Sequence, residues 1–211
     1  QNRPRVLIVG VRKDISIDPW KKIDSKVANG FLPKPTYGSP DLIDVLGDLI
    51  DPNFKYGGCN NIYINPATSK IQKLLRTRLD GKIAPKGWSL TEQDYSKHSE
   101  KVIDRFTYML KNKGVIPKHL KTKKFSQSLL PSRWGDKGPT ITATSLADDY
   151  VHFAQARILT VREWARLQGF PDWYEFSGNR TTGGIRRAGN PKKGIFDLAK
   201  EGGHSESRVL H

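Results

Sequence analysis

The chain has 211 residues, enough to bury one sizeable hydrophobic core, with or without a smaller lobe. Its formal net charge of +15, from 36 Lys and Arg against 21 Asp and Glu, favours a polyanionic partner; a merely solvated basic surface is the alternative. A single cysteine, Cys59, excludes an intramolecular disulfide framework and a multi-cysteine zinc site, while five Trp, seven Tyr and eight Phe argue against a disordered chain.

The hydropathy and the charge distribution of the chain bear on its location and on where a polyanionic partner would bind. The mean hydropathy is −0.59, and no apolar run approaches the roughly 20 residues that cross a bilayer, so no membrane association is expected. The N-terminal residues lack the pattern of a signal peptide, so we expect a cytoplasmic, nucleoid-associated protein. Because the chain begins with Gln, we expect further sequence upstream. Residues 61–130 hold 15 Lys and Arg against 5 Asp and Glu, so most of the excess positive charge lies in the middle of the chain.

The first half of the chain predicts one strand followed by helices. Residues 5–12 form a continuous apolar run, as in a buried strand. Residues 14–40 are rich in Pro and Gly and predict a loop. A helix is expected to open at Ser39–Asp41, and its predicted apolar face consists of Leu42, Ile43, Val45, Leu46, Leu49 and Ile50.

Two more helices are expected before the C-terminal third. One should begin at Asn65–Pro66 and end at Gly81, with Ile71, Leu74, Leu75 and Leu79 inside. The next should run from Ser99 to near Gly114, with Val102, Ile103, Phe106 and Leu110 inside. Residues 116–140 are basic and have no regular hydrophobic pattern. Residues 139–144 alternate between threonine and other side chains, as in a strand. The fold class is therefore α/β, in the sense of mixed α and β.

The segment from Arg157 to Phe176 carries the most information. Thr160 and Glu163 have the spacing of a capping box, and Val161, Trp164, Leu167 and Phe170 share one face of the helix that follows. Arg162 and Arg166 fall on another side. Gly169 suits the residue just past the helix, and Pro171 prevents its continuation.

From Arg157 to Asp172 the sequence is Arg-Ile-Leu-Thr-Val-Arg-Glu-Trp-Ala-Arg-Leu-Gln-Gly-Phe-Pro-Asp. This sequence resembles motif IX of the DNA cytosine-5 methyltransferases. Gln1-Asn2-Arg3-Pro4-Arg5, followed at once by the predicted strand, resembles motif VIII of the same family. In that family motif VIII precedes a variable target-recognition domain and motif IX follows it. About 150 residues separate the two segments here, and the most basic part of the chain lies between them.

The resemblance implies roles for single residues. Gln1, Arg3 and Arg5 would line the pocket for a cytosine flipped out of the duplex, with guanidinium groups at a base oxygen and a phosphate. For motif IX, we expect packing between two lobes rather than catalysis, because a capping box and ion-paired arginines explain its polar residues; these are Arg157, Thr160, Arg162, Glu163 and Arg166.

The same resemblance divides the chain into four parts. Residues 1–13 would end the catalytic domain at one edge of its sheet, and 14–145 would form an irregular target-recognition domain. Residues 146–187 would join the recognition and catalytic lobes, and 188–211 would be a disordered or truncated tail. Within the recognition domain we expect duplex DNA to be bound by exposed basic residues, namely Lys118, Lys121, Lys123, Lys124 and Arg133.

The chain lacks three motifs that the family reaction needs. No Pro-Cys nucleophile, no Glu-Asn-Val and no Phe-x-Gly-x-Gly turn occurs, and Cys59 follows glycine instead of proline. No histidine spacing indicates a metal site. The resemblance thus implies that the catalytic cysteine and most of the S-adenosylmethionine site belong to an N-terminal catalytic half, in cis or in trans. We therefore expect a bacterial DNA cytosine-5 methyltransferase portion that is inactive alone. A non-catalytic DNA-binding fragment or relic, and more remotely an RNA-binding basic protein, remain alternatives.

Overall fold

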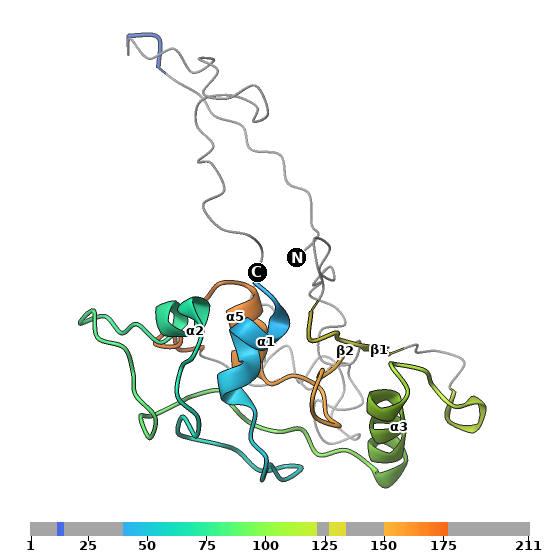
Figure 1. Cartoon of the computed structure of the whole chain (residues 1–211). Helices are drawn as coiled ribbons and strands as arrows, with labels where there is room; N and C mark the ends of the chain where they lie inside the picture. Colours follow the sequence, from blue (N-terminus) through green and yellow to red (C-terminus); the bar gives the residue numbers. More distant parts are fainter. Residues whose placement is uncertain (1–11, 15–39, 122–126, 134–149, 177–211) are drawn as a thin grey trace, which may run out of the picture.

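The computed structural model describes residues 12–14, 40–121, 127–133 and 150–176. Within these ranges it is a mixed helix-and-strand structure, which confirms the predicted fold class. Figure 1 shows helices α1, α2 and α5 grouped on one side, with α3 and the two short strands on the other. No helix of the described residues is long and apolar enough to cross a membrane. The predicted strands at 5–12 and 139–144 and the predicted tail lie outside these residues, save for Arg12.

Helix α1 (Leu42–Leu46) begins where the sequence predicts it. Asp41 is its N-cap, and the following 3-10 helix η1 (Gly47–Leu49) continues the same apolar side. Leu42, Leu46 and Leu49 are buried, but Ile43 is exposed, so the prediction that it lies inside is wrong. Its neighbour Asp44 is exposed as well, which leaves that side of the short helix in solvent.

Helix α2 (Lys70–Leu75) is shorter than predicted. It starts at a capping box formed by Ser69 and Gln72, not at Asn65–Pro66, and it ends at Arg76 well before Gly81. Asn65 is instead held outside the helix, because its side-chain amide donates to the Ile50 carbonyl at 2.8 Å. Leu79 therefore lies beyond the helix and is exposed, and Leu74, although within α2, is exposed as well, so the prediction that these two residues lie inside is wrong.

Helix α3 (Glu100–Lys111) confirms the third prediction. Ser99 is the N-cap, and the buried Phe106 and Met109 anchor one side of the helix. The chain reverses at Gly114, which has φ +85° and lies where a Cβ would come within 3.2 Å of Leu129. A 3-10 helix, η2 (Lys118–Leu120), follows.

The sheet is a parallel pair of very short strands, β1 (Ser128–Leu129) and β2 (Tyr150–Val151), with Ser128 opposite Tyr150. Isolated antiparallel bridges add Cys59 to Asp94 and Ile62 to Ser89. The larger hydrophobic core packs side chains from α1, η1 and α2 against α5 (Val161–Leu167). A smaller core joins α3 to the strands. Helix α5 therefore shares one core with segments about 70 to 120 residues earlier in the sequence.

Candidate functional site

Helix α5 has the ends that its sequence predicts. The Thr160 side chain accepts the Glu163 N–H at 3.1 Å, while the Glu163 carboxylate accepts the Thr160 N–H at 2.8 Å. This reciprocal pair is the predicted capping box, and Gly169 follows the helix with φ +86°. Trp164 is buried, and the rest of the predicted apolar face packs against the main core, namely Val161, Leu167 and Phe170.

The polar side chains of the helix are as buried as the apolar ones. Arg157, Arg162 and Glu163 have no measurable exposure, and Arg166 has 2%. A charge withdrawn from water this fully must be matched by opposite charge and hydrogen bonds, or the fold loses several kcal/mol. The structure supplies these partners in two separate clusters, one at the start of α5 and one at its end.

The first cluster is centred on Arg157 and Glu163. Arg157 Nη1 and Nη2 donate to the two carboxylate oxygens of Glu163 at 2.7 and 2.6 Å. The remaining guanidinium N–H groups donate to the Gln155 side chain and to the Ile158 carbonyl. All five donors of Arg157 are thereby used, which is the condition for burying this group. Gln93 closes the cluster, accepting from Thr160 at 2.7 Å and donating to Glu163 at 3.3 Å.

His152 borders this cluster and is also fully buried. Its Nδ1 accepts the Ala154 N–H at 3.0 Å, so the proton of the neutral ring is on Nε2, which lies 3.6 Å from Glu163. Burial lowers the pKa of His152 to about 3; Glu163 opposes this shift, and Arg157 adds to it. The imidazole is neutral in the folded protein.

Glu163 is held as a carboxylate. Burial alone would raise its pKa, but the charge and hydrogen bonds of Arg157 outweigh burial and lower the pKa to about 2. A carboxylate with four hydrogen-bond donors and a neutral histidine beside it has no accessible proton to exchange. The first cluster therefore holds the start of α5 as a rigid joint, and the opposite charges of Arg157 and Glu163 in it cancel.

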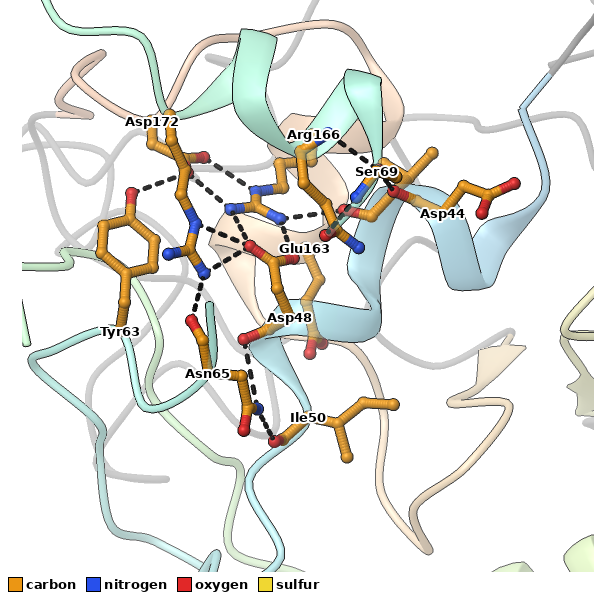
Figure 2. Close-up of polar contacts among 12 residues, drawn as sticks. Asp44, Asp48, Ile50, Tyr63, Asn65, Ser69, Glu163, Arg166 and Asp172 are labelled. Carbon is orange, nitrogen blue, oxygen red and sulfur yellow. Dashed lines mark hydrogen bonds and ion pairs between the residues drawn. The ribbon is translucent and has the colours of Figure 1, made fainter. Parts of the chain in front are cut away.

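The second cluster joins the end of α5 to α1, η1 and α2 (Figure 2). Arg166 donates to Asp172 at 2.9 and 2.6 Å and to Asp48 at 2.6 Å. Arg76 shares Asp48, with its Nε at 2.7 Å from the carboxylate. The Tyr63 hydroxyl donates to Asp172 at 2.7 Å. Two guanidinium groups and two carboxylates thus cancel, and all four side chains are buried.

In the second cluster, the neighbouring carboxylates keep Arg166 protonated, and burial together with Asp172 keeps Tyr63 protonated. Burial would lower the pKa of Arg166, but Asp172 and Asp48 raise it above the ordinary arginine value. Burial, followed by the Asp172 charge, raises the pKa of Tyr63, so the phenol stays a hydrogen-bond donor. Arg76 lies over the Tyr63 ring at 3.8 Å.

Arg162 joins two further segments without an ion pair. Its guanidinium donates to the Thr91 carbonyl and hydroxyl and to the Pro171 and Tyr174 carbonyls, at 2.8–3.3 Å. Burial lowers the pKa of Arg162, and the nearby Asp172 opposes that shift. Arg162 thus reaches Thr91 and residues 171–174, and Arg166 reaches the α1–η1 turn, while Arg157 is paired within its own segment.

The basic residues expected at DNA are spread over the surface. Lys118 and Lys121 are exposed at and just after η2, while Arg133 is exposed beside Asp41, 3.7 Å from its carboxylate. Gln1, Arg3, Arg5, Lys123 and Lys124 lie outside the described residues. Cys59 is exposed, and the described residues hold no group of acidic, His or Cys side chains that could bind a metal ion.

Sequence reasoning expected ion-paired arginines in motif IX but missed the partners that lie outside the segment. Asp48 and Gln155 bind its arginines directly, while Arg76 and Gln93 join through Asp48 and Glu163, and no helical spacing links Asp48, Arg76 or Gln93 to α5. The one available signal was Asp48 itself, a carboxylate between Leu46 and Leu49 on an otherwise apolar side.

Comparisons with known proteins identify the family. The model of the C-5 cytosine-specific DNA methylase family matches residues 1–193. Over 207 residues, which is 95% of its length, the chain is 32% identical to the type II methyltransferase M.NgoFVII of Neisseria gonorrhoeae. It is 27% identical, over 86% of its length, to the type II methyltransferase M.DdeI of Desulfomicrobium norvegicum. A shorter stretch of 76 residues, 34% of this chain and 8% of the relative, is 37% identical to DNA (cytosine-5)-methyltransferase 3 of Zea mays.

The chain spans less than half the length of these two type II methyltransferases, 45% of M.NgoFVII and 43% of M.DdeI. The family match covers more than nine-tenths of the chain and includes the whole of α5 with its two buried clusters. By this match, the chain belongs to the C-5 cytosine-specific DNA methylase family.

Proposed function

We propose that the chain is the DNA-binding and target-recognition portion of a bacterial DNA cytosine-5 methyltransferase. The complete enzyme would transfer a methyl group from S-adenosylmethionine to C5 of a cytosine flipped out of duplex DNA. One observation carries the proposal: the buried side chains of α5 join it to residues 45–48 and 91–93, all from the segment between the two motifs. Such a joint suits a helix that fixes a recognition domain to its catalytic lobe.

The division of labour follows from the residues present. Residues 14–145 would read DNA, and 146–187 would link the lobes. Residues 1–13 would close the base pocket through Gln1, Arg3 and Arg5. The motif IX residues would position the two lobes rather than take part in catalysis, because their hydrogen bonds are made to other groups within the protein. The nucleophile and most of the S-adenosylmethionine site would come from an N-terminal half, since the chain contains neither Pro-Cys nor Phe-x-Gly-x-Gly. Duplex DNA as substrate implies a nucleoid-associated location.

A chimaera tests this proposal. The chain is fused behind the N-terminal region of M.NgoFVII, the relative that it matches over 95% of its own length. Transfer of a labelled methyl group from S-adenosylmethionine to duplex DNA is measured, with each half alone as the control. We expect transfer by the chimaera only. Its Glu163→Gln form, in which the joint is broken, should lose activity together with thermal stability.

A second candidate, a non-catalytic DNA-binding fragment, is favoured by the absence of the Pro-Cys nucleophile. It predicts that the isolated chain binds duplex DNA while a folded chimaera transfers no methyl group. Failure of the chain to bind duplex DNA at low salt would contradict both candidates, because phosphate contacts dominate such binding.

A further inference from the structure

The loop that follows α2 differs in character from the rest of the described surface. Residues 77–88, called here the tip loop, project from the body on the side away from α3 (Figure 1). The loop is closed as a tight hairpin-like turn, since Thr77 bridges Ile83 and Arg78 N–H donates to the Lys82 carbonyl at 2.9 Å. Gly81 allows this turn with φ +78°.

Large apolar side chains are left in solvent on this loop. Leu79 is 81% exposed, the highest value among the large hydrophobic residues that the structure describes, and Ile83 and Trp88 are 47% and 45% exposed. Single exposed apolar residues are ordinary on protein surfaces, but several gathered on one projecting turn indicate a surface that is covered in a complex.

The charges around these side chains indicate the partner. The tip loop holds three cations and one carboxylate, Asp80, which is paired with Arg78. Lys82 and Lys86 are exposed and form no ion pair with any described residue. A surface that mixes free ammonium groups with an exposed aromatic ring suits nucleic acid better than an apolar protein face, which is depleted in lysine.

The loop is also preorganised. Arg78 stacks on the Trp88 ring at 4.2 Å, and Tyr63 exchanges two backbone hydrogen bonds with Gly87 and Trp88, at 2.8 and 3.0 Å. Through its hydroxyl, the same Tyr63 is anchored to Asp172 in the second buried cluster. The loop is therefore supported by the same cluster that holds α5, which lowers the entropy cost of presenting its side chains to a ligand.

We propose that the tip loop contacts duplex DNA, with Lys82 and Lys86 at phosphates and Leu79 and Trp88 against the sugars or bases of a groove. This rests on the proposed function and deepens it, because it adds a DNA-contacting surface to the one expected at Lys118, Lys121 and Arg133. Phosphate contacts set register, and apolar contacts in a groove discriminate among bases. The tip loop is thus a source of sequence preference.

Paired substitutions at Leu79 give the sharpest test, using the full chain and a duplex DNA probe. Leu79→Glu places a negative charge at the tip and should weaken binding about tenfold or more, whereas Leu79→Lys should bind at least as tightly as the unaltered chain. If the tip loop served a protein partner instead, both variants would bind the duplex as tightly as the unaltered chain. Thermal unfolding checks that neither variant is misfolded, as expected for a side chain this exposed.

The salt dependence of binding tests the lysines. Lys82→Gln with Lys86→Gln should reduce the slope of log K against log salt by about one unit for each lysine. The matched control is Lys101→Gln with Lys111→Gln on α3, two exposed lysines on the other side of the molecule, which should leave the slope unchanged. Trp88→Ala should weaken binding, and Trp88→Phe should restore most of it, because the apolar contact of an aromatic ring survives that change.

The two proposals fail in different ways. Loss of all duplex binding by the unaltered chain would contradict the proposed function. Normal binding by the unaltered chain, together with equal affinity and salt slope for the tip-loop variants, would overturn this inference and leave the proposed function standing.

Discussion

Arg157 and Glu163 form a two-point ion pair, with N–O distances of 2.7 and 2.6 Å, although neither side chain has any measurable contact with solvent. The pair closes the start of α5 onto the strand-like segment before it. Because both charges are sealed from water, each is tolerated only through the other. Several measurable consequences follow from this dependence and from the second cluster at the far end of the helix.

Removing one charge of this pair should be costly. Glu163→Gln keeps the shape of the side chain but leaves the Arg157 guanidinium buried without a carboxylate, and should lower the free energy of unfolding by about 3–5 kcal/mol. Urea unfolding measures the change. The control is Arg133→Gln, which removes an exposed ion pair and should cost at most about 1 kcal/mol. A cost for Glu163→Gln as small as that of the control would contradict the role assigned to the pair.

Asp48 should be as sensitive as Glu163, although it lies outside the motif. It is the carboxylate shared by Arg76 and Arg166, so Asp48→Asn leaves two buried guanidinium groups facing one carboxylate. We expect a loss of about 3–5 kcal/mol, measured by urea unfolding. Asp44→Asn, in the preceding helix α1 and exposed, is the control and should change stability by less than about 1 kcal/mol. Similar effects at the two positions would show that the second cluster adds little.

The cap of α5 gives a test with a matched helix. Thr160→Ala removes an acceptor for the Glu163 N–H and a donor to Gln93, and should destabilise the protein by about 1–2 kcal/mol. Ser99 occupies the N-cap of α3 but makes no side-chain capping hydrogen bond, so Ser99→Ala should cost only a few tenths of a kcal/mol. Thermal unfolding of both variants measures the contrast, and a larger loss at Ser99 would refute it.

Acid should destabilise the protein in two steps. His152 has a folded-state pKa of about 3 against 6.5 when unfolded, since burial first and Arg157 second disfavour its charged form, against the pull of Glu163. The unfolded chain therefore takes up a proton that the folded chain refuses. Its contribution to stability is complete above pH 6.5 and is lost as the pH falls toward 3.

Glu163 adds to the loss at lower pH. Its pKa falls from 4.5 to about 2 in the folded protein, so its contribution is complete above 4.5 and disappears as the pH falls through 2. Urea unfolding at about pH 7 and about pH 5 isolates His152, which should account for about 2 kcal/mol of the difference. His152→Gln, with no proton to take up, should reduce the difference by that amount. An unchanged difference would show that His152 titrates normally.

Local sequence predicted those features that depend on near neighbours. The capping box of Thr160 and Glu163 and the reversal at Gly169 involve groups within a few residues, so spacing alone sufficed. The same holds for the start of α3 at Ser99. Predictions failed where distant contacts competed with helical spacing. Helix α2 stops at Arg76, whose guanidinium is bound by Asp48, and Leu79 is consequently carried out to the exposed tip loop.

By itself, the sequence determined the family, the fold class and the helix that begins after Thr160, because these depend on a continuous motif, on composition and on local backbone preference. Only the tertiary structure decided what the arginines of that helix do. Their partners lie up to 121 residues away, and a buried charge pairs with whichever opposite charge the fold brings within about 3 Å. That proximity is a property of the packed chain, since no local spacing encodes it.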